Sequence, residues 1–199
     1  MCSRFTSGRK GLSPEDQRLE DEFVVAFQGL PRREISPRDL AVVLARGRGA
    51  ILRAVTMRWG FVRPWGTVFN GRSEELGKAM WREAAEKRRC AVPMEAFFEW
   101  KGTDPRNRRK YRFSSPVPAD DLWVAGVWEL GKLGELDFSI LTKPAPSWME
   151  SIHDRCPFLL PPESVVPYLD RAIDLAAPPD VRVLPRIEDD NQTQFLPSF

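Results

Sequence analysis

The sequence is poor in residues that mark several common protein classes. Its 199 residues include only three cysteines and one histidine. Cys2, Cys90 and Cys156 form an odd set without paired spacing, which argues against a disulfide framework and is typical of a reducing compartment. A zinc site built from Cys90, Cys156 and His153 would lack the usual CxxC or HxxxH pairing. We therefore expect neither a metal nor another cofactor.

Long apolar runs are also missing. No stretch approaches the roughly 20 apolar residues of a membrane-spanning helix, and the basic stretch 1–12 has no apolar segment behind it, unlike a secretory signal. We expect a cytoplasmic protein, associated with the nucleoid if it is bacterial, that does not contact a membrane. A hydrophobic content of 42% suffices for one substantial core. The length predicts a single domain over residues 1–199. We also expect the protein to be a monomer.

Charge is nearly balanced over the whole chain but not along it. The net charge is +2, yet segment 32–63 carries eight arginines against two acids, and segment 101–112 carries six basic residues against Asp104. The part beyond Pro162 is acidic. Such asymmetry is typical of proteins that bind a phosphate backbone. From charge alone, solvated arginines on an ordinary surface explain it equally well.

Turn residues and periodicity predict the first elements. Ser13 and Pro14 open a helix that ends before Gly29. The β-type runs Leu40–Ala45 and Ile51–Met57, joined by a glycine-containing turn, predict a hairpin. The segment Gly60–Gly66 is expected to be a loop rich in aromatics.

The second half alternates strands with short helices. Ser73 is expected to cap a helix that reaches about Arg88. Further strands are expected at Cys90–Trp100, Lys110–Phe113, Leu122–Leu130, Leu136–Thr142 and Val181–Leu184, and short helices at Ser147–Ile152 and Glu163–Leu169. The segment Glu188–Phe199 is expected to be loosely attached. Strands joined mostly by hairpins, with helices interspersed, predict an α+β fold with a largely antiparallel β core and flanking helices.

Cys2 is the candidate nucleophile. Removal of Met1 is normally efficient before a small residue and would leave a terminal 1,2-aminothiol, which no internal cysteine offers. The α-amine has a reference pKa of about 7.7–8.0, against about 10.4 for lysine, so far more of it is neutral at neutral pH. It can form a Schiff base with an aldehyde, and the thiol can close onto the same carbon as a five-membered thiazolidine. Taken alone, a cysteine at this position also arises by chance.

Three later groups are candidates to assist such chemistry. Asn70 and Arg72 precede an expected helix start, where backbone N–H groups favour phosphate, although Asn-Gly is also a common turn pair. Glu99 lies among aromatic residues, where burial raises a carboxyl pKa toward neutrality, unless the side chain faces solvent. His153 titrates near neutral pH and has Arg155 beside it as a phosphate ligand; a purely structural role is the alternative.

The aromatic segment 59–65 is a candidate nucleic-acid contact. Its tryptophans could stack on bases or act as a wedge. Core packing is the alternative, and we expect it for Trp59.

Taken in order, five motifs resemble those of the SOS response-associated peptidase (SRAP) family. Each motif is weak alone, but the ordered set over residues 2–157 is specific. The motifs are Cys2-Ser3-Arg4-Phe5, Trp59-Gly60-Phe61-Val62 with Pro64-Trp65, Asn70-Gly71-Arg72-Ser73-Glu74, Phe97-Phe98-Glu99-Trp100 and Ile152-His153-Asp154-Arg155-Cys156-Pro157.

The resemblance implies an α+β fold with a basic cleft for single-stranded DNA, whose abasic sites are crosslinked as a thiazolidine and so protected. It makes Cys2 the nucleophile and Asn70 the residue that holds the amine or the crosslink. Glu99 would act in Schiff-base formation and sugar ring opening, and His153 would transfer protons. The implied DNA contacts are Arg4, Pro37, Trp65, Arg72, Thr142 and Arg155.

The resemblance also implies secondary activities. The family name refers to a proposed self-cleavage that exposes Cys2, which removal of Met1 by a host enzyme would equally achieve. A lyase side reaction and an association with the replication machinery belong to the same set of expectations.

The sequence departs from the family pattern at several positions. Ser3 replaces the usual glycine, Gly71 replaces alanine and Glu75 stands where threonine is common. Glu34 replaces an asparagine in a motif that keeps Pro37, which puts one nucleic-acid contact in doubt.

Two functions of other classes stay open at this point. An N-terminal-nucleophile amidohydrolase or thiol peptidase would use Cys2 with its own amine as base, but would leave the basic clusters unexplained. A non-catalytic module for single-stranded nucleic acid would use the arginines and tryptophans alone. Its binding would be sensitive to salt and indifferent to the lesion.

Overall fold

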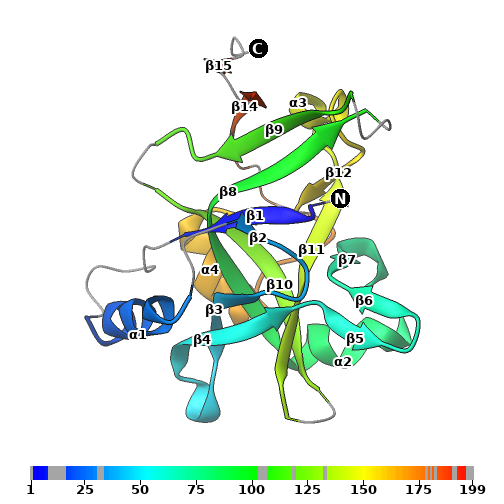
Figure 1. The fold of residues 1–199 in the computed structure, drawn as a ribbon. Coiled ribbons are helices and arrows are strands. Elements are labelled where there is room, and N and C mark those ends of the chain that lie inside the picture. The colour runs from blue at the N-terminus through cyan, green and yellow to red at the C-terminus, as the bar shows by residue number, and fades with distance from the viewer. Residues whose placement is uncertain are drawn as a thin grey trace.

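The chain is described by a computed structural model over residues 2–8, 17–30, 34–102, 107–117, 120–131, 134–177, 179, 181, 183–189 and 192–195. At its centre, five strands form a closed barrel (Figure 1). In barrel order they are β10 (Leu122–Leu130), β11 (Leu136–Pro144), β4 (Leu52–Trp59), β3 (Leu40–Arg46) and β8 (Arg89–Lys101), with β8 pairing back onto β10.

Most neighbouring strands of the barrel run antiparallel. The exception is a short parallel contact between β11 and β4, where Asp137 lies opposite Arg58 and Phe138 opposite Trp59. The α+β class with a largely antiparallel core is therefore confirmed.

Shorter strands extend the barrel at its edges. β1 (Arg4–Ser7) pairs with the second half of β8, and β2 (Glu34–Ile35) pairs with β1. Two strands, β7 (Asn70–Arg72) and β12 (Arg155–Pro157), pair with β11. The remaining strands are β13 (Leu159–Leu160) on β10, β9 (Arg109–Ser114) on β8, β14 (Leu184–Asp189) on β9, β15 (Gln192–Phe195) on β14, and the separate pair β5 (Phe61–Arg63) and β6 (Gly66–Val68).

Alternation along the barrel strands separates two cores, because successive side chains of a strand point to opposite faces. On β3, Ala41 and Val43 pack in the interior cluster with Trp59, whereas Val42 and Leu44 pack in the outer cluster. Both faces are apolar, so the strand is buried on both sides.

Three helices cover the outer face of the barrel (Figure 1). They are α1 (Gln17–Gln28), α2 (Ala79–Lys87) and α4 (Pro162–Leu169), which bury Phe23, Trp81 and Tyr168, respectively. Each of these rings removes a large apolar surface from water, which is the main force holding the helices to the sheet. No helix within the described part of the chain is long and apolar enough to cross a membrane.

Several predicted elements are confirmed. The hairpin of β3 and β4 and the strands β8, β9, β10 and β11 lie where the sequence places them, and so does α4. The short helix α3 (Ser147–Glu150) ends at Glu150 rather than at Ile152. α1 ends before Gly29 as expected, while Ser13 and Pro14 lie outside the described residues.

Three predictions were wrong. Gly60–Gly66 is not a loop but contributes to the β5–β6 hairpin, since Phe61 is buried and pairs with Val68. The helix expected at Ser73 is only a 3-10 turn, η2 (Ser73–Glu75), and α2 begins after Lys78, whose extended backbone breaks the helix.

The last predicted strand, Val181–Leu184, is displaced. The strand begins at Leu184, where pairing with Ser114 of β9 starts. Within Glu188–Phe199, the described residues 192–195 pair with β14 as β15.

Candidate active site

The N-terminal strand β1 carries Cys2 to one end of the barrel. Its register on β8 sets Arg4 opposite Phe98 and Phe5 opposite Phe97. Phe5 is fully buried and meets Trp59 edge to face, with ring centroids 4.9 Å apart. This apolar anchor fixes the strand, so the residues that precede it lie beside the part of β8 that carries Glu99.

Asn70 holds the backbone of Cys2. Its Nδ2 donates a hydrogen bond of 2.7 Å to the carbonyl oxygen of Cys2, and the Cys2 thiol donates to the carbonyl of Arg4 at 3.5 Å. The Oδ1 of Asn70 is buried and has no hydrogen-bond partner within the described residues. A buried acceptor of this kind favours a ligand that brings an N–H or O–H group.

Glu99 is a buried carboxyl beside this cysteine, with only 2% of its surface exposed. The alternative in which it faces solvent is therefore excluded. Burial, with a smaller contribution from the charge of Asp154, raises the pKa of Glu99 to about 7. Burial also raises the pKa of the Cys2 thiol, as does the negative charge of Glu99. At neutral pH the thiol is thus protonated, and the α-amine is the better first nucleophile.

His153 follows α3 (Ser147–Glu150), and its Nδ1 has two close neighbours. The backbone N–H of Arg155 lies 2.9 Å away, and an oxygen of Asp154 is also at 2.9 Å. One nitrogen cannot accept from the first and donate to the second together. Burial lowers the pKa of His153, so at neutral pH we assign the neutral ring, with Nδ1 accepting and Nε2 carrying the proton.

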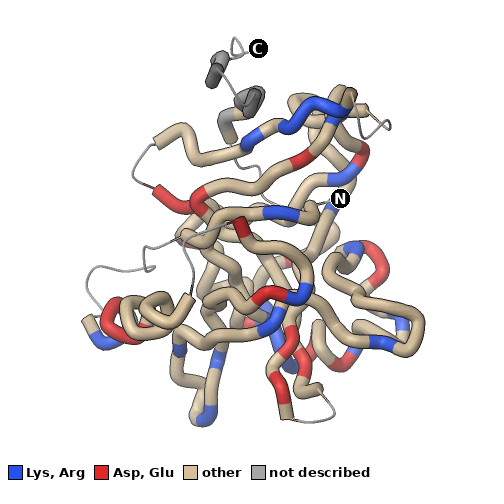
Figure 2. The backbone as a smooth tube through the Cα atoms, viewed as in Figure 1, with Lys and Arg blue, Asp and Glu red and all other residues tan. Residues whose placement is uncertain are grey.

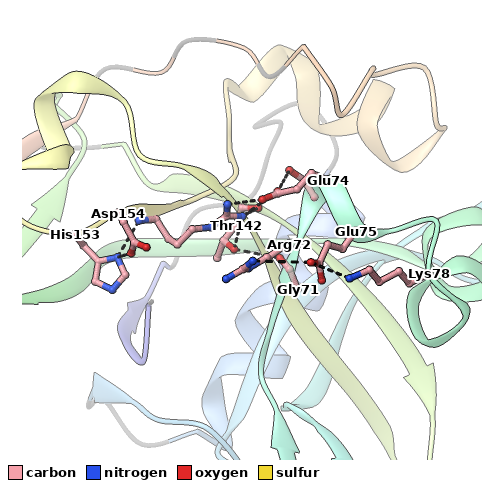
Figure 3. Close-up of polar contacts among 10 residues, drawn as sticks. Gly71, Arg72, Glu74, Glu75, Lys78, Thr142, His153 and Asp154 are labelled. Atoms are coloured by element: carbon pink, nitrogen blue, oxygen red, sulfur yellow. Dashed lines mark hydrogen bonds and ion pairs between the residues drawn. The ribbon is translucent and has the colours of Figure 1, made fainter.

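Arg155 is buried at the centre of a hydrogen-bond network that ties four segments together (Figure 3). Its two terminal nitrogens donate to Glu74 at 2.5 and 3.0 Å, and one of them also donates to the backbone oxygen of Thr142 at 2.8 Å. Thr142 in turn donates from its hydroxyl to the carbonyl of Gly71 at 3.2 Å. The hydrogen bond from Arg155 lowers the pKa of Glu74, which keeps this carboxyl ionised.

Both predicted DNA ligands of this network are buried. Arg155 is 7% exposed and Thr142 is fully buried. In this structure their side chains join β12, β11, β7 and η2. Glu74 already accepts hydrogen bonds from both terminal nitrogens of Arg155, the donors that a phosphate would use.

The other predicted DNA contacts lie at the surface. Arg4 and Arg72 are exposed, and Pro37 is half-buried in a turn. Trp65 is 74% exposed at the tip of the β5–β6 hairpin. This hairpin is held to the barrel by Arg63, which donates two hydrogen bonds of 2.6 and 2.8 Å to Glu129.

Basic residues are interspersed with acidic ones along the chain (Figure 2). Those of β9 and β1 lie toward the same end of the molecule as the N-terminus. Part of this charge is paired internally, since Arg112 contacts Glu95 at 2.7 Å. For DNA binding, we therefore expect the exposed arginines near Cys2, such as Arg4, to contribute more than the total charge of the chain.

The family model for the SOS response associated peptidase (SRAP) matches residues 1–194. The chain belongs to the SRAP family. Its relatives include several proteins with the name "abasic site processing protein". YoqW of Bacillus subtilis is 27% identical over 183 residues, which are 85% of this chain and 80% of YoqW. YMR114C of Saccharomyces cerevisiae is 34% identical over 139 residues, which are 64% of this chain and 36% of YMR114C.

Solved structures share the fold of this SRAP chain. A protein from Bacteroides thetaiotaomicron matches with a TM-score of 0.74 at 18% identity, over 96% of this chain and 93% of that one. A protein from Bordetella bronchiseptica matches with a TM-score of 0.71 at 21% identity, over 94% and 100%. At these identities the likeness concerns the fold alone.

In the SRAP chain, four predicted site residues lie together at the barrel end where β1 begins, a region that we call the Cys2 corner. They are Cys2, Asn70, Glu99 and His153. Asn70 contacts Cys2 directly, and the charge of Glu99 acts on the Cys2 thiol. His153 adjoins Asp154, whose charge acts on Glu99. Trp65 and Pro37 come from other turns of the chain.

Two residues of the site were missed in sequence. Cys156 packs in the same interior cluster as Cys2, and its proximity adds to the raised pKa of the Cys2 thiol. Glu74 was present in the quoted motif, but its pairing with Arg155 spans 81 positions and left no local signal. No three His, Cys, Asp or Glu side chains gather as a metal site in the described part of the molecule.

One departure from the family pattern has a local explanation. Glu34, which stands where the family has asparagine, pairs with Lys110. The ammonium of Lys110 lies 4.1 Å from the ring centre of Phe98. Glu34 therefore balances a lysine held over an aromatic ring next to β1.

Proposed function

We propose that this SRAP chain captures abasic sites in single-stranded DNA as covalent thiazolidine crosslinks through Cys2. The observation that carries the proposal is the placement of Cys2 beside Asn70 and Glu99, with His153 adjoining, at the barrel end where β1 begins. The names of the relatives agree with this substrate.

The reaction joins the two nucleophilic atoms of residue 2 to one carbon. After removal of Met1, the α-amine of Cys2 adds to the C1′ aldehyde of the ring-opened sugar, and the carbinolamine loses water to form an imine. The thiol sulfur then adds to the carbon of the protonated imine, and the thiol proton goes to Glu99, which restores the proton that Glu99 gave to the leaving hydroxyl. The product is a thiazolidine, and the net by-product is one water.

Each neighbouring residue has a distinct part in this sequence. Glu99, with a pKa of about 7, protonates the leaving hydroxyl of the carbinolamine and takes up the thiol proton afterwards. Asn70 holds the Cys2 carbonyl through its Nδ2 and offers its unused Oδ1 as an acceptor to the amine or to a sugar hydroxyl. His153, with its proton on Nε2, assists opening of the sugar ring.

The proposal includes two accompanying activities. Exposure of Cys2 is either self-cleavage after Met1 or the work of a host enzyme. A Schiff base also acidifies the adjacent sugar carbon, so strand cleavage as a lyase competes with crosslinking. Closure of the thiol onto the imine consumes that intermediate and protects the strand.

Denaturing electrophoresis tests the proposal. Protein incubated with a single-stranded oligonucleotide bearing one abasic site should give a heat-stable band of lower mobility, and its intact mass should equal protein lacking Met1 plus oligonucleotide minus one water. Cys2→Ala should abolish the band. Cys90→Ala, which removes a thiol buried elsewhere in the same core, is the matched control and should retain it.

Cys2→Ser separates the two steps. It keeps the α-amine but removes the sulfur, so it should form only a Schiff base that heat reverses and that a hydride reductant traps. No heat-stable band from wild-type protein that has lost Met1 would refute the proposal. An acyl-enzyme at Cys2 would instead support an amidohydrolase, and salt-sensitive binding indifferent to the lesion would support a non-catalytic module.

A further inference from the structure

A concave site lies outside the barrel, between α2 and the turn that follows α4. It is a pocket of about 580 Å³. It shares no lining residue with the Cys2 corner, although Leu76 and Gly77 in its wall directly follow η2. The described residues that line it are Leu76, Gly77, Arg82, Ala85, Glu86, Arg89, Arg171 and Leu175.

Three arginines converge on this pocket, and backbone oxygens orient each of them. Arg82 donates to the carbonyl of Gly77 at 3.0 and 3.1 Å. Arg89 donates to the carbonyls of Ala85 at 3.1 Å and of Tyr168 at 3.2 Å. Arg171 donates to the backbone carbonyl of Glu86.

None of these guanidinium groups forms an ion pair with a carboxylate among the residues that the structure describes. Neutral carbonyls use only part of the five N–H donors that each guanidinium has. This contrasts with Arg46, Arg63 and Arg155, each of which is matched to a carboxylate.

The positive charges also act on one another. Burial lowers the pKa of Arg89, and the charge of Arg171 lowers it further. Arg89 is half-buried, whereas Arg82 and Arg171 are exposed and can reach a ligand from solvent. An anion bound between Arg89 and Arg171 would compensate their mutual repulsion. The one acidic residue in the described wall, Glu86, is exposed and meets Arg171 through its backbone.

The rest of the wall decides which anion fits. Leu76, Ala85 and Leu175 are apolar, and the described lining contains no aromatic ring on which a base could stack. A nucleic-acid strand crossing α2 would also pass the exposed carboxylates of Glu83 and Glu86. An anionic group joined to an aliphatic side chain matches both the arginines and the leucines.

We propose that this pocket binds an acidic peptide segment of a partner protein, with carboxylates on Arg82, Arg89 and Arg171 and an adjacent aliphatic side chain against Leu76 and Leu175. The site is independent of the crosslinking chemistry. It gives the molecule a means of recruitment to a protein while Cys2 stays free for DNA.

Fluorescence anisotropy with labelled peptides tests this site. The probe is Gly-Asp-Asp-Asp-Leu-Leu, and the controls are Gly-Asn-Asn-Asn-Leu-Leu and Gly-Asp-Asp-Asp-Ser-Ser. The acidic aliphatic peptide should bind more tightly than both controls. Arg82→Gln and Arg171→Gln should each weaken it about tenfold, because each removes a charge-assisted hydrogen-bond donor. Arg48→Gln, an exposed arginine of another turn, should change nothing.

Every variant is also assayed for crosslinking to abasic DNA, which should stay at the wild-type rate. That readout separates failure of the pocket from failure of the proposed function. The peptide assignment is overturned if the acidic peptide does not bind, if the neutral peptide binds equally well, or if binding ignores Arg82 and Arg171. It is also overturned if lesion-free single-stranded DNA binds in a manner that these two substitutions abolish.

Discussion

At the scale of single residues, Glu99 serves two opposed requirements. A carboxyl that is 2% exposed is costly to ionise, yet the proposed chemistry needs it to give and take protons near neutral pH. Because burial raises the pKa of Glu99 to about 7, the same burial lets this carboxyl exchange protons near neutral pH. The residue beside it in space, Cys2, is protonated for the same physical reason.

The pH dependence of crosslinking should report Glu99. The amine must be neutral, which fails at acid pH, and Glu99 must be protonated, which fails above its pKa of about 7. The single-turnover rate should therefore be bell-shaped, with its maximum between about 7 and 8. Glu99→Gln should lower the rate by about 10²–10⁴-fold and remove the alkaline limb.

Glu95→Gln is the control for this profile. Glu95 lies on the same strand but is exposed and pairs with Arg112. Its variant should keep both limbs. An unchanged alkaline limb in Glu99→Gln would assign that limb to another group.

At the scale of elements, the 3-10 turn η2 and strand β12 are joined by Glu74 and Arg155. Arg155 also donates its backbone N–H to His153, so the pair positions the histidine. Glu74→Gln should lower Tm by about 2–4 °C, which corresponds to roughly 1 kcal/mol because Glu74 is partly exposed. The crosslinking rate should fall by more than this loss of stability explains.

Glu75→Gln is the matched control, since Glu75 is the next residue and pairs only with surface groups, Lys78 at 2.9 Å and Arg72 at 3.9 Å. Its Tm and rate should both match the wild type. Equal effects of the two substitutions would remove the positioning role of Glu74.

The β5–β6 hairpin supports a separate prediction. Trp65 is exposed at its tip, while Arg63 fixes its base. Trp65→Ala should leave Tm unchanged but weaken binding of single-stranded DNA about tenfold, within the range for a lost base–aromatic stack. Val62→Ala, at another exposed apolar position of the hairpin, should not alter the affinity for DNA. Fluorescence anisotropy of a labelled single-stranded oligonucleotide measures both affinities.

At the scale of the whole molecule, the barrel links stability to site geometry through Phe5. Phe5→Ala should cost about 3–5 kcal/mol, because a fully buried ring is replaced by a cavity beside Trp59. Urea unfolding measures this cost. Crosslinking should drop even where the variant is fully folded, since β1 then no longer holds Cys2. Val24→Ala on the exposed face of α1 should change neither.

Local sequence signals predicted much of the fold, but closure of the sheet depends on distant pairings. The apolar runs of β8 and β10 gave both strands, yet nothing local indicates that Leu122 lies opposite Met94. The parallel contact of β11 with β4 joins residues 79 positions apart, Arg58 and Asp137.

The candidate site was predicted in part for the same reason. Cys2 and Asn70 came from motifs, and the structure joins them by a hydrogen bond. Burial of Glu99 was ambiguous in sequence, because a strand has two faces and only the packed fold distinguishes them. Arg155 was expected to be available to DNA, and its pairing with Glu74 became visible only in three dimensions.

The place of β1 has a mechanical consequence for a protein anchored by its second residue. A motor that drags crosslinked DNA would pull directly on a strand held to β8 by four residue pairs. Tension along the strand would load all four at once, whereas tension across it would open them singly, beginning at Arg4 and Phe98. Because β1 is not one of the five strands that close the barrel, it could separate from β8 while the barrel stayed closed.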